Sequence, residues 1–255
     1  MKINLNADMG ESFGIYKIGN DDMLLDVIKS ANIACGFHAG DPLVIANTIE
    51  TALAKGVSLG AHPSYPDLHG FGRRSMSLSP KELKASIIYQ VGALDGLASS
   101  LGSNASHVKP HGALNNDACE NAEIAKVVAE AIYAYDRDII LLAPVLSELA
   151  KAGLDAGLNV AMEVFADRAY TDEGNLVSRS VPGAVLHDSD ECLEHVLRMV
   201  EKRGLTSING KYLPVKFHSI CVHGDNAHAV DTALKVRQGL EAHGLNVVKL
   251  TDIDL

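Results

Sequence analysis

The chain has 255 residues, of which 47% are hydrophobic and 21% are charged. This composition supplies enough apolar material for a large core and excludes a disordered chain. The formal net charge of -10 offers no basic footprint for a phosphate backbone, so we expect no nucleic-acid binding.

The cysteines and the apolar runs indicate the cellular compartment of the protein. Cys35, Cys119, Cys192 and Cys221 lie far apart without a C-x-x-C pair, which argues against a disulfide framework and against a zinc ribbon. No apolar run reaches the roughly 18 residues of a membrane span, and the first residues, MKINLNADMGE, contain no hydrophobic signal core. We therefore expect a cytoplasmic protein that does not bind membranes.

Short apolar runs alternate with longer helical patterns along the whole chain. The runs predict strands at 2–7, 31–35, 57–61, 106–109, 138–143, 158–164, 217–222 and 245–250. Between them, apolar residues recur at helical spacing, as at Ile45, Ile49 and Ala52 and again at Ile124 and Val128. The pattern predicts repeated βα units with a parallel sheet.

Helix starts and long loops punctuate this pattern. Asp41-Pro42 and Ser79-Pro80 fit N-caps followed by a proline in the first turn. Glu82 completes a capping box with Ser79, and Asp188 with Glu191 offers a weaker one. The connections at 62–79 and 165–188 are long and rich in Gly, Pro and Arg. Long irregular loops in a compact α/β chain are more often functional than accidental.

We expect one domain over residues 1–255, because no linker or composition break interrupts the pattern. Ionisable side chains follow six of the predicted strands: Asp8, His38, His62, Lys109 with His111, Glu163 with Asp167 and Arg168, and His223 with Asp225. In a barrel all strand C-termini meet on one face, whereas the outer strands of an open sheet are too far apart to share a site. Convergence therefore favours a barrel.

Four histidines stand at equivalent strand ends, in CGFHAGDP (His38), GAHPSYPD (His62), VKPHGAL (His111) and CVHGDN (His223). A lone histidine there is usually a hydrogen-bonded loop residue, but the recurrence favours function. A neutral imidazole can act as a general base or as a metal ligand. Asp8 with His38 and His62 is one possible divalent-metal site, although no H-x-x-x-H or H-E-x-x-H motif is present.

Cationic residues gather in the same regions. Arg73 and Arg74 lie in one long loop, Arg168 and Arg179 lie in the other, and Lys109 lies among the histidines. An arginine fork pairs with a carboxylate or a phosphate, so we expect at least one of these arginines to hold an anionic substrate. The alternative is a solvated loop charge, or a salt bridge to Glu11, Asp67, Asp167 or Asp172. The usual phosphate-binding and dinucleotide-binding glycine motifs and the serine-hydrolase elbow are absent.

Several longer motifs carry a family resemblance. In order and spacing, LNADMGES, SANIACGFHAGDP, GAHPSYPDLHGFGRR, HVKPHGAL, EVFADRAY, DEGNLVSRS and CVHGD resemble the LamB/YcsF family, from Asn4 to about Leu250. The resemblance implies a distorted parallel β/α (TIM-like) barrel of the glycoside hydrolase and deacetylase type, with about seven strands. It also implies ATP-dependent opening of the lactam of 5-oxoproline to L-glutamate. The two further 5-oxoprolinase subunits, B and C, would act with this chain, and the whole complex would use the ATP.

The resemblance suggests roles for the convergent residues. Asp8, His38, His62, His111, Glu163 and His223 would form the polar floor of one site. Glu163 or a nearby histidine would activate water, and His111 or His223 would protonate the departing nitrogen. Arg73, Lys109, Arg168 and Arg179 would bind carboxylate or phosphoryl oxygens. A stand-alone metal-dependent deacetylase or amide hydrolase, and a non-catalytic substrate-binding protein within the complex, are the alternatives.

Three positions depart from the pattern of the family. Asn115 stands where tyrosine is expected, LLAPVLSEL (141–149) replaces LVGLAGSEL, and VSRS (177–180) replaces VPRS. None of the changes removes an ionisable candidate. The change at 143–147 is expected to alter the pocket wall beside the fifth strand.

Overall fold

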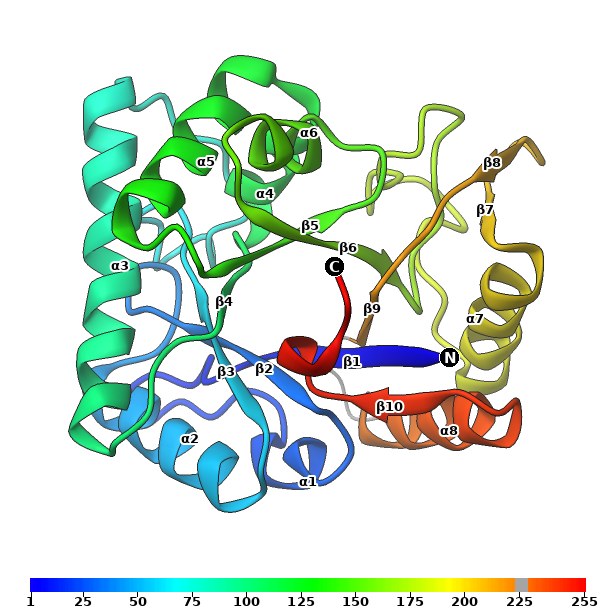
Figure 1. Ribbon diagram of the computed structural model, residues 1–255, viewed down its shortest axis with the longest axis horizontal. Coiled ribbons are helices and arrows are strands. Elements are labelled where there is room, and N and C mark those ends of the chain that lie inside the picture. Colours follow the sequence, from blue (N-terminus) through cyan, green and yellow to red (C-terminus); the bar gives the residue numbers. More distant parts are fainter. Residues whose placement is uncertain (223–228) are drawn as a thin grey trace.

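The computed structural model describes residues 1–222 and 229–255. Its main sheet contains eight parallel strands, arranged around the centre of the molecule (Figure 1). They are β1 (Lys2–Met9), β2 (Ser30–Ala34), β3 (Ser58–His62), β4 (His107–Val108), β5 (Ile140–Pro144), β6 (Asn159–Phe165), β9 (Ser219–Val222) and β10 (Asn246–Val248). All eight strands predicted from the sequence are present, and the predicted barrel is confirmed.

The barrel closes through β1. Its residues 4–7 pair with β9, which also pairs with β6, so that seven strands form a closed ring in the order β1-β2-β3-β4-β5-β6-β9. The opposite edge of β1 is shared, because residues 2–4 pair with β10 and residues 6–9 pair with β2. β10 therefore extends the ring at its N-terminal end only.

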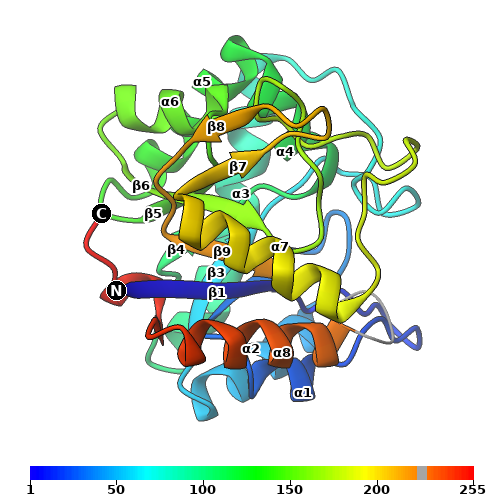
Figure 2. The same cartoon turned by 90° about the vertical axis from the view of Figure 1, so that its right-hand side faces the viewer.

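Helices cover the outside of the ring, and α7 packs beside α8 (Figure 2). The helices are α1 (Asp21–Leu25), α2 (Pro42–Ala54), α3 (Pro80–Ser100), α4 (Gly112–Glu120), α5 (Ala122–Tyr135), α6 (Glu148–Asp155), α7 (Ser189–Lys202) and α8 (Ala229–Ala242), with a 3₁₀ turn at Leu250–Asp252. None of these described helices combines the length and apolar character that crossing a membrane requires.

The predicted helix starts are confirmed. Asp41 accepts hydrogen bonds from the amides of Leu43 and Val44, so this residue has the structural role of an N-cap. Ser79 forms a complete capping box with Glu82, and Asp188 caps α7.

An antiparallel ribbon of β7 (Gly204–Thr206) and β8 (Tyr212–Pro214) was not predicted from the sequence. Its strands have three residues each, which is too short for an alternating pattern to stand out. The ribbon holds the loop that follows β6: the amide of Ile208 donates to the carbonyl of Tyr170, and Ser207 and Asn209 donate to the carboxylate of Asp172.

Side chains alternate between the two faces of each strand. In β1, for example, Ile3, Leu5, Ala7 and Met9 belong to the main hydrophobic core. The intervening Asn4 and Asn6 hydrogen-bond to side chains of other strands, including Ser30, Glu163 and Ser219, and so lie in the lumen of the barrel. The main apolar core thus lies between strands and helices, and much of the lumen is polar.

Candidate active site

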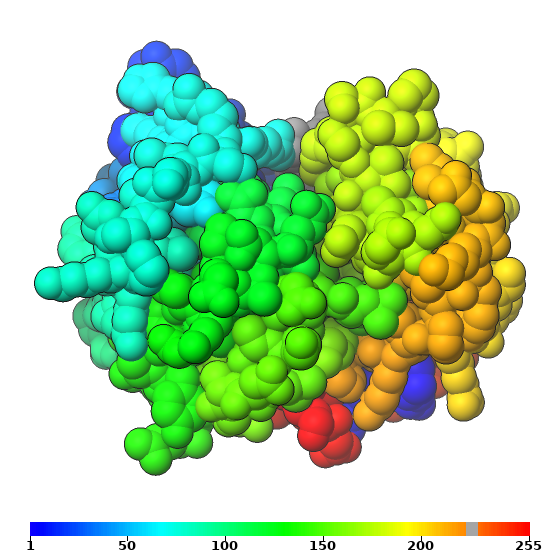
Figure 3. Space-filling view, turned by 90° about the horizontal axis from the view of Figure 1, so that it is seen from above, coloured from blue at the N-terminus to red at the C-terminus, as the bar shows by residue number. Residues whose placement is uncertain are grey.

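A cavity of about 550 Å³ opens where the barrel strands end. Figure 3 shows a hollow between the segment after β3 (cyan) and the segment after β6 (yellow-green). Most of the residues singled out from the sequence line this cavity: Asp8, His62, Arg73, Lys109, His111, Arg168 and Arg179. The expected convergence of strand-end residues is therefore found, while His223 lies outside the described residues.

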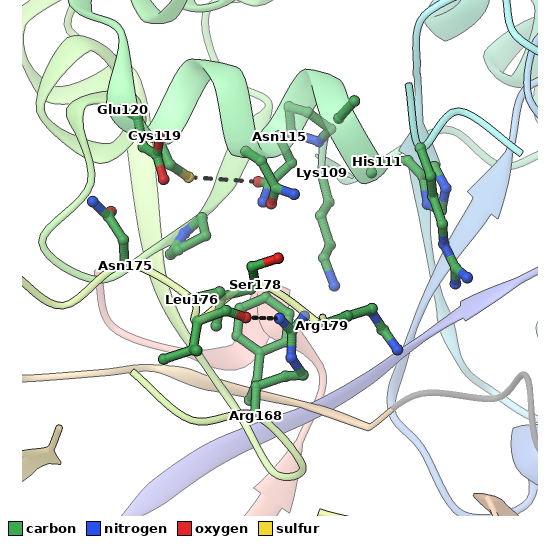
Figure 4. Close-up of a pocket in the computed structure, with 18 of the residues that line it drawn as sticks. Lys109, His111, Asn115, Cys119, Glu120, Arg168, Asn175, Leu176, Ser178 and Arg179 are labelled. Atoms are coloured by element: carbon green, nitrogen blue, oxygen red, sulfur yellow. Dashed lines mark hydrogen bonds between the residues drawn. The ribbon is translucent and has the colours of Figure 1, made fainter. Parts of the chain in front are cut away.

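Lys109 is the central cation of the site. It is 3% exposed, and its Nζ lies 3.2 Å from Asp8 Oδ1 and 3.1 Å from Glu163 Oε1. Burial opposes its charge, but the two carboxylates outweigh burial and hold the pKa of Lys109 well above its ordinary value. Lys109 is therefore an ammonium that points toward the cavity (Figure 4).

Glu163 lies deeper than expected from the sequence. It is fully buried and falls outside the set of described residues that line the cavity. Its Oε1 accepts from Asn6 and pairs with Lys109, and burial raises the pKa of this carboxyl while Lys109 partly offsets the effect. This geometry suits a counter-ion for Lys109 better than a group that contacts water in the cavity.

The rings of His62 and His111 contact each other at the wall of the cavity. His62 Nδ1 lies 2.6 Å from the carbonyl oxygen of Lys109, and His111 Nε2 lies 2.9 Å from the carbonyl oxygen of Phe71. Their remaining nitrogens, His62 Nε2 and His111 Nδ1, are 2.9 Å apart. Asp8 Oδ2 approaches His62 Nε2 to 3.2 Å.

His38 lies behind this pair. Its ring stacks on that of His111 with centroids 3.9 Å apart, and the side chain is fully buried. Burial and the neighbouring His111 and His62 hold the pKa of His38 well below its usual value, and burial with His62 lowers the pKa of His111 to about 3. Both imidazoles are therefore neutral at pH 7.

The loop after β3 passes directly over these rings at Gly72. This residue has a φ of +64°, and a Cβ there would lie 2.3 Å from Ser64 Oγ and 2.9 Å from His38 Cβ. Only glycine fits this close approach without displacing the histidine. The preceding Phe71 also has a positive φ (55°), and its carbonyl fixes His111.

The loop after β6 forms the opposite wall and contains two of the arginines (Figure 4). Arg168 is 7% exposed and donates to the carbonyls of Val177 (2.7 Å) and Ala184 (3.4 Å), so it organises this loop as well as lining the cavity. Burial and the nearby Arg179 lower its pKa, yet a guanidinium remains charged at neutral pH. The outcome is a cationic wall suited to an anionic ligand.

The departures from the family pattern meet at this cavity. Asn115 of α4, Pro144 of β5 and Ser178 of the loop after β6 all line it. Pro144 places the replaced segment 143–147 at the cavity, and its effect on the shape of the wall stays a prediction.

Four side chains could hold a metal ion: Glu11, His38, His62 and His111. Each offers one donor atom, these atoms lie within 4.8 Å of one another, and all four residues are buried. The group shares His38 and His62 with the set expected from the sequence, but it contains Glu11 and His111 in place of Asp8. Sequence reasoning treated Glu11 as a possible arginine counter-ion; its place three residues after Asp8 in NADMGE was the available signal.

Carboxylates, imidazoles and cations thus surround one cavity. The carboxylates and imidazoles can accept a proton from water, and Lys109 and the arginines can stabilise developing negative charge. This combination suits attack of water on the carbonyl of an anionic substrate.

Comparison with known proteins decides the family. The LamB/YcsF family matches residues 3–254. The chain belongs to this family. The A subunit of the 5-oxoprolinase of Azoarcus sp. (strain BH72) is 59% identical over 253 residues, which cover 99% of each chain.

Solved structures agree with this family membership. The lactam utilization protein from Thermus thermophilus is 41% identical, with a TM-score of 0.92 over 97% of this chain and 99% of that one. The Bc1960 peptidoglycan N-acetylglucosamine deacetylase, with a TM-score of 0.51 and 14% identity over 98% of this chain and 86% of that one, shares the fold alone. The resemblance noted in the sequence motifs is confirmed.

Proposed function

We propose that this chain is the A subunit of an ATP-dependent 5-oxoprolinase, which opens the lactam of 5-oxo-L-proline to give L-glutamate. The main support is the 59% identity, over nearly the full length of both chains, to a protein named as the A subunit of 5-oxoprolinase. The cavity adds chemical support, because it combines proton acceptors with a cationic wall.

The geometry favours Asp8 as the group that accepts the proton of the attacking water. Asp8 lines the cavity, and its Oδ1 is fixed by Lys109 (3.2 Å) and Asn32 (3.0 Å), so that the carboxylate is oriented. Water oxygen bonds to the lactam carbonyl carbon, the carbon–nitrogen bond breaks, and the proton held by Asp8 passes to the departing nitrogen. His111 is less suited as donor, because its Nε2 hydrogen is directed at the Phe71 carbonyl.

Cationic residues hold the anions in this proposal. Lys109 lines the cavity and stabilises the negative charge that develops on the oxygen atoms around the attacked carbon. Arg73, Arg168 and Arg179 bind the substrate carboxylate and a phosphoryl group. Glu163 keeps Lys109 charged and in place, and His38 and His62 complete the floor.

ATP and partner subunits complete the proposal. An unstrained lactam needs an activated carbonyl, and transfer of the terminal phosphoryl group of ATP to its oxygen, with ADP leaving, is the direct chemical route. Attack of water and cleavage of the carbon–nitrogen bond then leave an acyl phosphate, which a second water hydrolyses to glutamate and inorganic phosphate. We assign ATP use to the complex with subunits B and C. In this complex, residues 1–255 of the present chain form one domain.

We place the protein in the cytoplasm. The four cysteines of this chain are buried free thiols, which fits a reducing compartment.

The test is ATP-dependent glutamate release by the chain purified together with subunits B and C. Asp8→Asn should lower the rate by at least about 100-fold, as expected when an acid–base group is lost. His111→Ala should lower the rate less, because His111 lines the cavity and contacts His62 without carrying the reacting proton. His69→Gln is the matched control, since His69 is an exposed residue of the loop after β3. The proposal is wrong if the complete complex releases no glutamate, or if both variants keep the full rate.

The same experiment separates the alternative functions. Hydrolysis of amides without ATP or partners would indicate a stand-alone hydrolase, for which the Glu11 and histidine group is the supporting observation. Binding of 5-oxoproline that is lost in Arg168→Ala, together with unchanged turnover in Asp8→Asn and His111→Ala, would indicate a non-catalytic role in the complex.

A further inference from the structure

Within the group of Glu11, His38, His62 and His111, two ring nitrogens lie in close contact although neither can donate a hydrogen to the other. A backbone carbonyl can only accept, so His62 must carry its hydrogen on Nδ1, which faces the Lys109 carbonyl at 2.6 Å. By the same argument His111 carries its hydrogen on Nε2, which faces the Phe71 carbonyl at 2.9 Å. In the neutral rings, two lone pairs therefore face each other, on His62 Nε2 and His111 Nδ1, at 2.9 Å.

Two further donors lie beside this pair. Glu11 Oε1 is 3.8 Å from His111 Nδ1 and 3.8 Å from His38 Nε2. His38 is fully buried, and neither of its nitrogens has a hydrogen-bond partner among the described residues. A buried imidazole without a partner is costly, and this is the arrangement expected for a ligand whose partner is an ion.

We propose that Glu11, His38, His62 and His111 bind one divalent transition-metal ion of the zinc type. A cation between His62 Nε2 and His111 Nδ1 turns the facing lone pairs into two coordinate bonds. Atoms bound to one metal at roughly 2.0–2.2 Å lie about 3–3.6 Å apart, close to the separations of 2.9 and 3.8 Å between neighbouring donors. All four donor atoms lie within 4.8 Å of one another, so small side-chain shifts toward the ion would complete the site.

The donor types decide the class of metal. Three imidazole nitrogens and one carboxylate oxygen suit Zn²⁺, Mn²⁺, Fe²⁺ or Co²⁺, whereas Mg²⁺ and Ca²⁺ prefer oxygen ligands. The hydrogen bonds from His62 to the Lys109 carbonyl and from His111 to the Phe71 carbonyl are the outer contacts that orient metal-binding histidines. His62, His111 and Glu11 also line the cavity, so the ion would lie at its wall next to Asp8.

The test uses the full chain alone, without partner subunits or substrate, so its result does not depend on the proposed reaction. The protein is stripped with a chelator, and binding of Zn²⁺, Mn²⁺, Co²⁺ and Mg²⁺ is measured by calorimetry and elemental analysis. We expect one Zn²⁺ or Co²⁺ per chain, no Mg²⁺ at the same concentration, and a visible Co²⁺ spectrum of a nitrogen- and oxygen-ligated site. The melting temperature should rise with Zn²⁺.

Variants locate the ion. His62→Ala and Glu11→Gln should weaken Zn²⁺ binding by more than about 100-fold, since even outer contacts typically change metal affinity by 10–100-fold. His69→Gln should bind as the unmodified chain does. Glu11→Gln keeps the shape of the side chain, so it remains informative if His62→Ala fails to fold. A stripped chain that takes up less than about one tenth of an ion and shows no shift in melting temperature would overturn the proposal, and a proton shared by His62 and His111 would then explain their contact.

Discussion

The lumen of the barrel and the layer between strands and helices are built from the same strands but have opposite chemistry. On β1, Leu5 packs outward into the apolar core, whereas Asn6 bonds inward to Glu163 and Ser219. Inward residues of other strands continue the network, as His107 does with Asn32 at 3.0 Å. The apolar layer can be rearranged with tolerance, but a buried polar network must be satisfied throughout, so it fixes each member's position.

This difference explains the placement of the site. The network ends at Asp8 and Lys109, so the cavity's charged groups rest on hydrogen-bonded residues rather than on apolar side chains. Only a small apolar cluster, Ile140, Leu142, Ala161 and Leu250, stands apart from the main core in the part of the chain that the structure describes.

Removing the central cation should have the largest effect on stability. Lys109→Met leaves Asp8 and Glu163 without their buried partner and should lower the free energy of unfolding by about 3–5 kcal/mol. Chemical denaturation measures the loss. Adding Glu163→Gln should restore part of it, and Lys126→Met, at an exposed lysine of α5, should have little effect. A loss below about 1 kcal/mol for Lys109→Met would show that the lumen does not depend on its charges.

A methyl group in the lumen should be the next most damaging change. A Cβ at Gly60 of β3 would lie 2.1 Å from His107 Nε2, so Gly60→Ala should cost about 1–3 kcal/mol of stability. On α3, Gly96 has open space around it, and Gly96→Ala should stabilise by up to about 1 kcal/mol. Thermal unfolding of the two variants measures the contrast, and shifts of the same sign would refute it.

The buried imidazole of His107 should make stability depend on pH. Burial and the nearby Lys109 lower the pKa of His107 to about 3, while the unfolded chain binds the proton near pH 6.5. His107 thus stabilises the fold above pH 6.5, and this contribution is lost as pH falls toward 3, by about 1.4 kcal/mol per pH unit. Denaturation of His107→Gln between pH 4 and 6 should show a slope shallower by about one proton; an unchanged slope would contradict this assignment.

The outer layer should respond least to the loss of a single polar contact. Ser79→Ala removes the cap of α3 and should cost about 1 kcal/mol, measured by denaturation. Ser99→Ala, at an exposed position near the end of the same helix, should be neutral. Equal effects would mean that the cap contributes nothing.

Much of the fold and part of the site were predictable from local patterns. Apolar runs and caps such as Ser79 depend on neighbouring residues alone, so the strands of the main sheet and three of the helix starts were found. The depth of Glu163 and the grouping of Glu11 with His38, His62 and His111 depend on contacts between distant segments, which spacing does not encode. In KINLNADM, the polar residues Asn4, Asn6 and Asp8 alternate with apolar ones, and this alternation does indicate a polar lumen. The sequence prediction did not include it.

The ribbon of β7 and β8 supports one wall of the pocket without being part of the barrel. It is held to the loop after β6 through Tyr170 and Asp172, and it pairs with no strand of the ring among the described residues. Insertions or substitutions in this ribbon can therefore reshape the wall that carries Ser178 and Arg179, while Asp8, Lys109 and the histidines stay in place. The charged groups on the barrel strands thus keep their positions through hydrogen bonds that do not involve the ribbon.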